Sequence, residues 1–158
     1  MAVEIERKFL VKKDVWKDIY KPKPSHLKQA YILEEDQKVV RIRIKGKNAF
    51  LTIKNKGRGI SRLEFEYQIP IHDAISLIQT MGGPTIEKER FEILFQGKCW
   101  EVDVFSGSNQ GLILAEIELT SEDERFQKPE WIGQEVSQDE RYFNVNLQKY
   151  PFSEWKDK

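Results

Sequence analysis

The sequence has very few of the residues that form disulfides, zinc sites and thiol active sites. Its 158 residues include one cysteine, Cys99, and two histidines, His26 and His72. A lone cysteine excludes a disulfide within one chain and fits a reducing compartment. Structural zinc sites usually take four Cys or His ligands, and neither histidine stands in a context that would activate a cysteine nucleophile. Zinc binding and thiol catalysis are therefore not expected.

Long apolar runs and a net charge of either sign are also missing. No segment is apolar over the roughly 20 residues that a membrane helix needs, and no signal-peptide pattern is present. The 26 basic and 26 acidic residues cancel, which removes any overall attraction to nucleic acid or to an anionic membrane. We expect a soluble cytoplasmic protein that binds neither of these partners.

Charged residues are nevertheless abundant, at 33% of the chain, compared with about 25% in a typical protein. The length suits one domain with a substantial core, and no linker, internal repeat or low-complexity segment divides it. We therefore expect a single domain over residues 1–158, in which so many charges must have a defined arrangement.

Alternation of apolar and polar residues, which is typical of half-buried strands, extends over most of the chain. Residues 40–45, Val-Arg-Ile-Arg-Ile-Lys, show it clearly, and glycine-containing turns such as 46–48 and 57–59 separate such segments. We expect eight strands, at 2–10, 26–34, 38–46, 49–55, 61–69, 85–95, 99–106 and 112–120.

Helices are predicted at three places only. Apolar residues at helical spacing after Pro70 predict one over 71–80. The sequence Ser-Glu-Asp-Glu from Ser121 resembles a capping box and predicts another, and a third is expected within 139–150. Eight strands with so few helices favour an α+β fold that is mostly β, namely an eight-stranded antiparallel β-barrel with flanking helices and no free edge strand. A β-sandwich is the alternative.

Charges of one sign recur along single strands. Arg41 and Arg43 are both basic, whereas Glu116 and Glu118 are both acidic. Like charges on one face repel each other, so a face that is merely solvated would tend to mix signs. Faces of one sign are typical of ligand binding, and an eight-stranded barrel can turn them inward around one small ligand. The plainer alternative is that these faces are solvated on the outside.

Metal and phosphate chemistry would explain both kinds of face. Glu4, Glu6 and Lys8 lie on one face of the first predicted strand. Paired carboxylates bind hard divalent cations such as Mg²⁺ or Mn²⁺, and clustered Lys and Arg bind phosphate oxygens. Because buried unpaired charge is costly, the two sets would have to pair with each other, with water or with a ligand such as a metal–polyphosphate complex.

Residues 4–8, Glu-Ile-Glu-Arg-Lys, resemble the ExExK signature of the CYTH, or triphosphate tunnel metalloenzyme, superfamily. The signature alone has little specificity, but further similar segments follow in order over nearly the whole chain, as in the short bacterial members. These segments are 29–32, 40–43, 51–54, 64–66, 87–91, 101–105, 114–118 and 135–142.

The resemblance implies an eight-stranded antiparallel barrel around a charged tunnel. It also implies divalent-metal-dependent hydrolysis of triphosphates, with Mg²⁺ or Mn²⁺ as the cofactor and inorganic tripolyphosphate as the leading substrate. A class IV-type adenylate cyclase and a thiamine triphosphatase are alternatives within the same chemistry. A polyphosphate- or nucleotide-binding module without turnover is the non-enzymatic alternative. A homodimer is compatible with the family.

The resemblance further implies roles for individual residues, which share one face within each strand. The metal ligands, acting directly or through water, would be Glu4, Glu6, Glu116 and Glu118, with Asp103, Glu64 and Glu66 supporting a second ion or the water. The triphosphate would be held by Lys8, Arg41, Arg43, Lys54, Lys88, Arg90 and Arg141.

Tyr31 is implied as a catalytic proton acceptor. A phenol is a weak base at pH 7, although surrounding cations favour its ionised form. The alternative is a tyrosine packed in the barrel wall with a hydrogen-bonded hydroxyl. Two positions depart from the related short members. Ala30 stands where glycine is usual, and Glu140 stands where lysine is common, so that a phosphate contact there would fall to Arg141.

Overall fold

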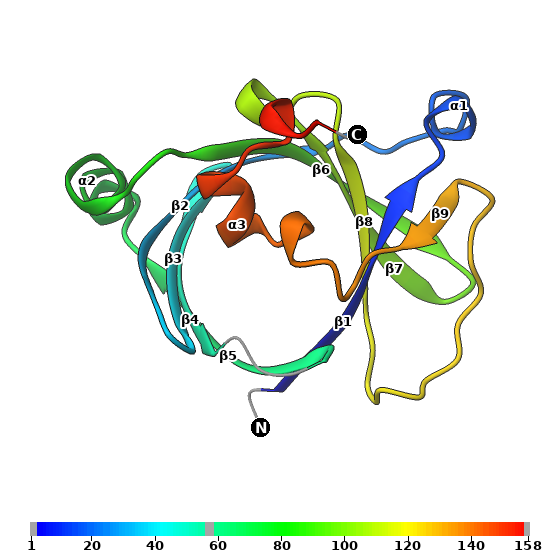
Figure 1. Ribbon diagram of the computed structural model, residues 1–158, viewed down its shortest axis with the longest axis horizontal. Helices are drawn as coiled ribbons and strands as arrows, with labels where there is room; N and C mark the ends of the chain where they lie inside the picture. Colours follow the sequence, from blue (N-terminus) through cyan, green and yellow to red (C-terminus); the bar gives the residue numbers. More distant parts are fainter. Residues whose placement is uncertain (1–2, 56–58, 157–158) are drawn as a thin grey trace.

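Eight antiparallel strands wrap into a closed ring around a central tunnel, and a ninth strand pairs with one of them (Figure 1). The computed structural model describes residues 3–55 and 59–156. Around the ring the order is β1, β5, β4, β3, β2, β6, β7 and β8, after which the ring returns to β1. The antiparallel barrel is thereby confirmed, and the sandwich is excluded.

The alternation of the sequence predicts each ring strand to within two residues of its observed bounds. The turn expected at 57–59 lies partly outside the described residues. The sequence does not predict the ninth strand, β9 (Ile132–Glu135), because four residues are too few to show an alternation. The ring strands are β1 (Val3–Val11), β2 (Ser25–Glu35), β3 (Lys38–Lys45), β4 (Asn48–Asn55), β5 (Ser61–Ile69), β6 (Ile86–Phe95), β7 (Lys98–Phe105) and β8 (Ile113–Glu118).

Short helices flank the ring. α2 and α3 confirm the helices expected over 71–80 and within 139–150. Among the described helices, none has the length and apolarity needed to cross a membrane. The helices are α1 (Lys13–Trp16), α2 (Ile71–Met81) and α3 (Asn144–Lys149), with the 3-10 turns η1 (Gly107–Asn109), η2 (Glu140–Tyr142) and η3 (Phe152–Glu154).

The helix expected from Ser121 is not formed, and residues 121–131 run as turns and loop. A capping contact does exist, because Glu124 Oε1 accepts hydrogen bonds from the backbone N–H and the hydroxyl of Thr120 at 2.6 and 2.7 Å. The segment lacks an apolar stripe at helical spacing, and Pro129 would interrupt a helix. The start signal alone therefore predicts a helix wrongly.

Strand β1 closes the ring by pairing on both of its sides. Residues 3–5 pair with residues 61–63 of β5, and residues 6–10 pair with residues 114–118 of β8. The end of the strand also pairs with β9. Because of this double pairing, the acidic residues of β1 lie between those of β5 and those of β8.

Apolar side chains on the outer face of the ring are buried by the elements that cover it. Helix α2 packs Ala74 and Ile78 against Ala30, Ile42 and Ala49 of three neighbouring strands. This arrangement places the apolar core outside the barrel wall and leaves the opposite face of each strand free to carry charge.

The four tryptophans belong to the packed core as well. Trp16 and Trp100 each meet Trp131 edge to face, with ring centroids 5.2 and 6.0 Å apart. Trp155 meets Tyr142 in the same way at 5.0 Å. All four indoles are almost fully buried, so none of them is available to stack on a ligand in the tunnel.

Candidate active site

The ring encloses a cavity of about 1070 Å³ whose lining is mostly charged. Every residue that the sequence predicts for the site lines this cavity except Asp103. Residues 137–149, here called the C-terminal segment, lie across the opening of the ring (Figure 1) and contribute to the lining. The charged strand faces therefore point inward, and the alternative of charges solvated on the outside is wrong.

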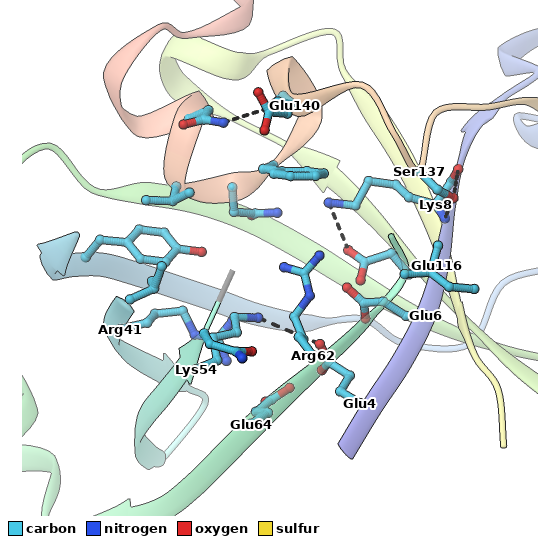
Figure 2. A pocket seen from close by; sticks show the side chains of 18 of the residues that line it. Glu4, Glu6, Lys8, Arg41, Lys54, Arg62, Glu64, Glu116, Ser137 and Glu140 are labelled. Carbon is cyan, nitrogen blue, oxygen red and sulfur yellow. Dashed lines mark hydrogen bonds and ion pairs between the residues drawn. The ribbon is translucent and has the colours of Figure 1, made fainter. Parts of the chain in front are cut away.

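Carboxylates from three neighbouring strands form one wall of the cavity, here called the acidic wall. Strands β5, β1 and β8 lie side by side, and the register of β1 and β8 places Glu6 opposite Glu118 and Lys8 opposite Glu116. Figure 2 shows most of these carboxylates gathered on one side of the tunnel. The acidic wall consists of Glu4, Glu6, Glu64, Glu116 and Glu118.

Glu4 holds a buried carboxylate oxygen that no described residue satisfies. Its Oε1 atom has no hydrogen-bond donor among residues 3–55 and 59–156, and Lys54 Nζ lies 3.9 Å away from it. Burial raises the pKa of Glu4 to about 7, and a hydrogen bond with Glu64 acts in the same direction. A buried carboxylate with an unsatisfied oxygen fits the coordination of a cation.

The pKa values of the neighbouring Glu6 and Glu116 are shifted in opposite directions. Burial and the adjacent Glu116 raise the pKa of Glu6 well above its ordinary value. Burial would also raise the pKa of Glu116, but Lys8, whose Nζ lies 4.0 Å from Oε1, helps to hold it at about 2. Burial and the charge of Glu4 raise the pKa of Glu118. The acidic wall thus retains protons that a divalent cation would displace.

The acidic wall fits a divalent ion that shares its coordination with a phosphate. Within the described ranges, no group of three or more His, Cys, Asp or Glu side chains has a geometry that could hold a metal ion by itself. Mg²⁺ usually keeps several waters and binds through one or two carboxylates together with substrate phosphates. The unsatisfied Glu4 Oε1 and the raised pKa of Glu6 are features that such an ion would relieve.

Cations on β3, β4 and β6 form the opposite wall, here called the basic wall. Arg41 Nη2 donates to Thr52 Oγ1 at 3.1 Å, whereas Arg41 Nε is buried without a hydrogen-bond partner in the described residues. Arg43 Nε donates to Gln29 Oε1 at 2.8 Å. Burial, together with the charge of Arg41, lowers the pKa of Arg43 to about 10. A bound polyanion would relieve this crowding of positive charge. The basic wall consists of Arg41, Arg43, Lys54, Lys88 and Arg90.

Asp103 lies behind the basic wall and is only 1% exposed. Its two carboxylate oxygens accept hydrogen bonds from Arg90 at 2.7 and 2.9 Å, and Lys88 Nζ lies 2.6 Å from Oδ2. Burial opposes ionisation of Asp103, but Arg90 and Lys88 hold its pKa far below the usual range. In this position Asp103 anchors two cations, and its role as a support of the metal stays a prediction.

The C-terminal segment satisfies two cations of the tunnel with neutral oxygens. Lys8 Nζ donates to the backbone carbonyl of Tyr142 at 3.1 Å, and Lys88 Nζ donates to Asn144 Oδ1 at 2.9 Å. The same oxygen of Asn144 accepts a hydrogen bond from Gln29 Nε2 at 3.3 Å. Burial lowers the pKa of Lys88 to about 7. These oxygens accept hydrogen bonds from the ammonium groups of Lys8 and Lys88, which the sequence predicts to bind the triphosphate.

Tyr31 and Arg141 also line the cavity. The backbone N–H of Tyr31 donates to Gln148 Oε1 at 2.9 Å, and its ring belongs to an apolar cluster at this end of the barrel. Arg141 pairs with Asp139 at 2.9 Å, and its guanidinium carbon lies 4.8 Å from the centroid of Trp155. The proton transfer and phosphate contact assigned to these residues stay predictions.

Some lining residues have no role in the prediction from the sequence, notably Arg62, Glu101, Phe143 and Asn144. Strand parity could have found the first two, because each shares a strand face with residues that were predicted. No pattern marks the other two, since their place in the tunnel depends on how the C-terminal segment folds back over the ring.

Comparisons with known proteins agree over nearly the whole chain. The family model of the CYTH domain matches residues 2–149. A curated protein of Acetivibrio thermocellus named inorganic triphosphatase is 44% identical over 158 residues, which cover 99% of this chain and 100% of that protein. A protein of the same name from Nitrosomonas europaea is 37% identical over 148 residues, which cover 91% and 95%.

Solved structures of other proteins are also similar to this chain. The crystal structure of an inorganic triphosphatase is 34% identical, covers 92% of this chain and 97% of its own, and has a TM-score of 0.64. The structure of an adenylate cyclase candidate from Bacillus halodurans is 21% identical with a TM-score of 0.55, and it covers 78% of this chain and 84% of its own. The second similarity concerns the fold alone.

Proposed function

This chain belongs to the CYTH domain family, and on that premise we propose that it is a divalent-metal-dependent hydrolase that cleaves inorganic tripolyphosphate. One observation carries the proposal: a single cavity holds an acidic wall on β1, β5 and β8 and a basic wall on β3, β4 and β6. A linear triphosphate with a bound cation has charges that match both walls. Two relatives named inorganic triphosphatase support the same substrate.

The acidic wall would hold Mg²⁺ or Mn²⁺. When bound, such an ion neutralises phosphate oxygens and polarises the phosphorus that is attacked. Carboxylate oxygen is the ligand type that both ions prefer, and the unsatisfied Oε1 of Glu4 supports this assignment. The proposed ligands are Glu4, Glu6, Glu116 and Glu118, with Glu64 and Glu66 toward a second ion or the water.

The basic wall and Lys8 would hold the phosphate chain in place. Guanidinium groups can bind phosphate oxygens in pairs, and the Nε atom of Arg41 is a donor without a partner among the described residues. Asp103 would act on the substrate through Lys88 and Arg90, whose side chains it orients. Positioning and charge stabilisation of this kind make up most of the catalysis of phosphoryl transfer.

A water held by carboxylates or by Tyr31 would attack the terminal phosphorus. Tyr31 Oη is proposed as the proton acceptor, because its side chain lines the cavity together with Arg43 and Lys88. The cleaved bond joins the terminal phosphorus to its bridging oxygen, and the products would be phosphate and diphosphate.

Phosphate release from tripolyphosphate in the presence of Mg²⁺ or Mn²⁺ tests the proposal. We expect faster release from tripolyphosphate than from ATP or thiamine triphosphate, because the lining offers mostly charge and the tryptophans are packed elsewhere. Cyclic AMP formed from ATP would indicate the cyclase instead. Tripolyphosphate that binds in calorimetry without phosphate release would indicate a binding module. No release from any of the three substrates contradicts the hydrolase.

The proposal includes a cytoplasmic protein with one domain over residues 1–158. The lone Cys99 supports a reducing compartment. A family match over residues 2–149 and one ring that draws strands from both halves of the chain support a single domain.

The proposal also includes a homodimer formed through the outer face of β4 and β5. On this face Ile53, Leu63, Phe65 and Tyr67 are between 41% and 56% exposed, and Ile53 pairs directly with Phe65. Half-exposed side chains of this size present roughly 300–400 Å² in total. That is close to half of the ~800 Å² that each partner contributes to a standard interface. The net charge of zero adds no overall repulsion between two copies.

A further inference from the structure

Arg62 projects into the tunnel from β5, between the carboxylates of the acidic wall (Figure 2). The register of β5 against β1 places it opposite Glu4. It shares the inward face of β5 with Glu64 and Glu66, which both line the same cavity. Arg62, like Lys8 of β1, is therefore a cation set among the carboxylates of the acidic wall.

Within the described part of the chain, the guanidinium of Arg62 has no hydrogen-bond or ion-pair partner, although several carboxylates line the same wall. Its Nε atom is buried without a hydrogen-bond partner among these residues. By contrast, Arg90 is held in two hydrogen bonds by Asp103, and Arg41 donates to Thr52. A guanidinium has five N–H donors in a fixed fork. Those of Arg62 remain available for the oxygens of a ligand in the tunnel.

The aromatic ring of Phe143, in the C-terminal segment, lies against the guanidinium of Arg62. The ring centroid lies 5.6 Å from the guanidinium carbon of Arg62 and 5.5 Å from Lys8 Nζ. Both distances are within the range in which an aromatic face attracts a cation. The residues on either side, Tyr142 and Asn144, accept hydrogen bonds from Lys8 and Lys88. The ring is thereby fixed between two cations at the edge of the acidic wall.

We propose that Arg62 is a further triphosphate-binding residue and that Phe143 is a positioning residue for Arg62 and Lys8. This inference rests on the proposed function. Oxygens of a triphosphate that face the basic wall meet several cations, whereas those that face the acidic wall would meet carboxylates. Arg62 supplies a positive charge on that side, next to the proposed metal ligand Glu4. A role limited to neutralising the wall would instead pair Arg62 with one of its carboxylates.

Calorimetric binding of tripolyphosphate in metal-free buffer tests the two residues without turnover. We expect Arg62→Gln to raise the Kd by about 10- to 100-fold, because charged hydrogen bonds to phosphate are lost. The Kd of Arg62→Lys should lie between those of Arg62→Gln and the wild type, since lysine keeps the positive charge but lacks the paired N–H donors of a guanidinium. Arg125→Gln is the matched control, because it removes the same charge from an exposed residue outside the tunnel.

The Phe143 variants separate positioning from simple packing. Phe143→Leu keeps an apolar side chain without an aromatic face and should raise the Kd by about two- to tenfold. Phe143→Tyr keeps the face and should bind as the wild type does. Equal loss in both variants, or tighter binding by Phe143→Leu, overturns the positioning role.

The same measurements separate this inference from the proposed function. Wild-type protein that neither binds nor hydrolyses tripolyphosphate overturns both. Equal affinity of the wild type and Arg62→Gln overturns the inference alone, because phosphate release by the wild type is measured separately. A loss of affinity in Arg62→Gln with an unchanged melting temperature supports the binding role.

Discussion

Carboxylates inside this barrel fall into two groups according to their nearest cation. Burial raises the pKa of Glu4 to about 7, and burial with Glu116 raises that of Glu6. Asp103 is buried more deeply than either, but burial is outweighed there by Arg90 and Lys88, which lower its pKa. For Glu4 and Glu6 the effect of burial exceeds that of the nearby Lys54, whereas Asp103 is already neutralised by two cations. Substitutions of the two kinds of carboxylate should therefore have opposite effects on stability.

Substitution Glu4→Gln should reduce tripolyphosphate hydrolysis by about 100-fold or more while leaving the fold intact. It removes a proposed metal ligand. Even the mutation of a residue that only supports a metal ligand typically lowers activity by about 10- to 100-fold. Without metal its melting temperature should match or exceed that of the wild type at pH 8, because a buried charge is removed. Phosphate release and thermal melting check both parts, with the exposed Glu130→Gln as the control. Retained activity would contradict the ligand assignment.

Substitution Asp103→Asn should destabilise the protein strongly. It removes the anion that pairs with Lys88 and leaves Arg90 with Glu101 alone, at 3.1 Å. Breaking a buried ion pair costs about 3–5 kcal/mol. Asp139→Asn is the matched control, because it breaks the exposed pair with Arg141, which is worth about 0–1 kcal/mol. Denaturant unfolding measures the difference. Unchanged stability combined with weaker Mg²⁺ binding would instead make Asp103 a metal ligand.

The stability of the metal-free protein should decrease as the pH rises from about 4.5 to 7. Over this window folded Glu4 keeps a proton that the unfolded chain has released, so the folded state binds more protons and loses stability with rising pH. The shift corresponds to about 3 kcal/mol at most. Above pH 7 the lowered pKa of Lys88 acts in the opposite direction, because folded Lys88 loses its proton before the unfolded chain does.

Calorimetric melting between pH 4.5 and 10 checks this pH dependence. We expect a minimum in the melting temperature near neutral pH without metal, and a shallower one with Mg²⁺, which binds the ionised folded state. The decrease should also be smaller in Glu4→Gln. An equally steep decrease in that variant would show that Glu4 is not its source.

Among the strands, β1 and β5 have the shortest pairing in the ring. Residues 3–5 and 61–63 form three paired positions, whereas β3 and β4 form eight. Local opening is easiest where few backbone hydrogen bonds must break. Amide hydrogens at this junction should therefore exchange faster than those between β3 and β4.

Tripolyphosphate with Mg²⁺ should slow amide exchange at the junction of β1 and β5. Glu4 on β1 and Glu64 on β5 both face the cavity, so a ligand bound to them would hold the two strands together. Hydrogen exchange read by mass spectrometry checks this, with peptides of β3 and β4 as the internal control. Uniform exchange around the ring, or no change on binding, would contradict it.

The strands and their inward-facing residues were predictable because both follow from the alternation of side chains between the two faces of a strand. Once the alternation of 40–45 is placed in a barrel, the inward face of Arg41 and Arg43 follows directly. The contacts of Asp103 were not predictable, because they depend on the register of β6 against β7, which places Arg90 directly opposite it. The helix expected from Ser121 failed because a local start signal says nothing about an apolar face.

At the scale of the whole molecule, the exposed outer face of β4 and β5 should hold two copies together. Phe65→Lys places a charge on this face and should shift a concentration-dependent dimer toward monomer in light scattering. Leu94→Lys is the control, since Leu94 is 77% exposed at the end of β6, on another strand. A wild-type protein that is monomeric at every concentration would contradict the dimer.

The double pairing of β1 determines when the site can first exist. Glu6 faces Glu118 across two strands that lie more than a hundred residues apart in the sequence, and pairings over such distances form slowly. While the chain is being synthesised, the carboxylates of β1 stay exposed to solvent until β8 has left the ribosome. No fragment that ends before β8 can assemble the acidic wall, so affinity for the ion arises only in the step that closes the ring.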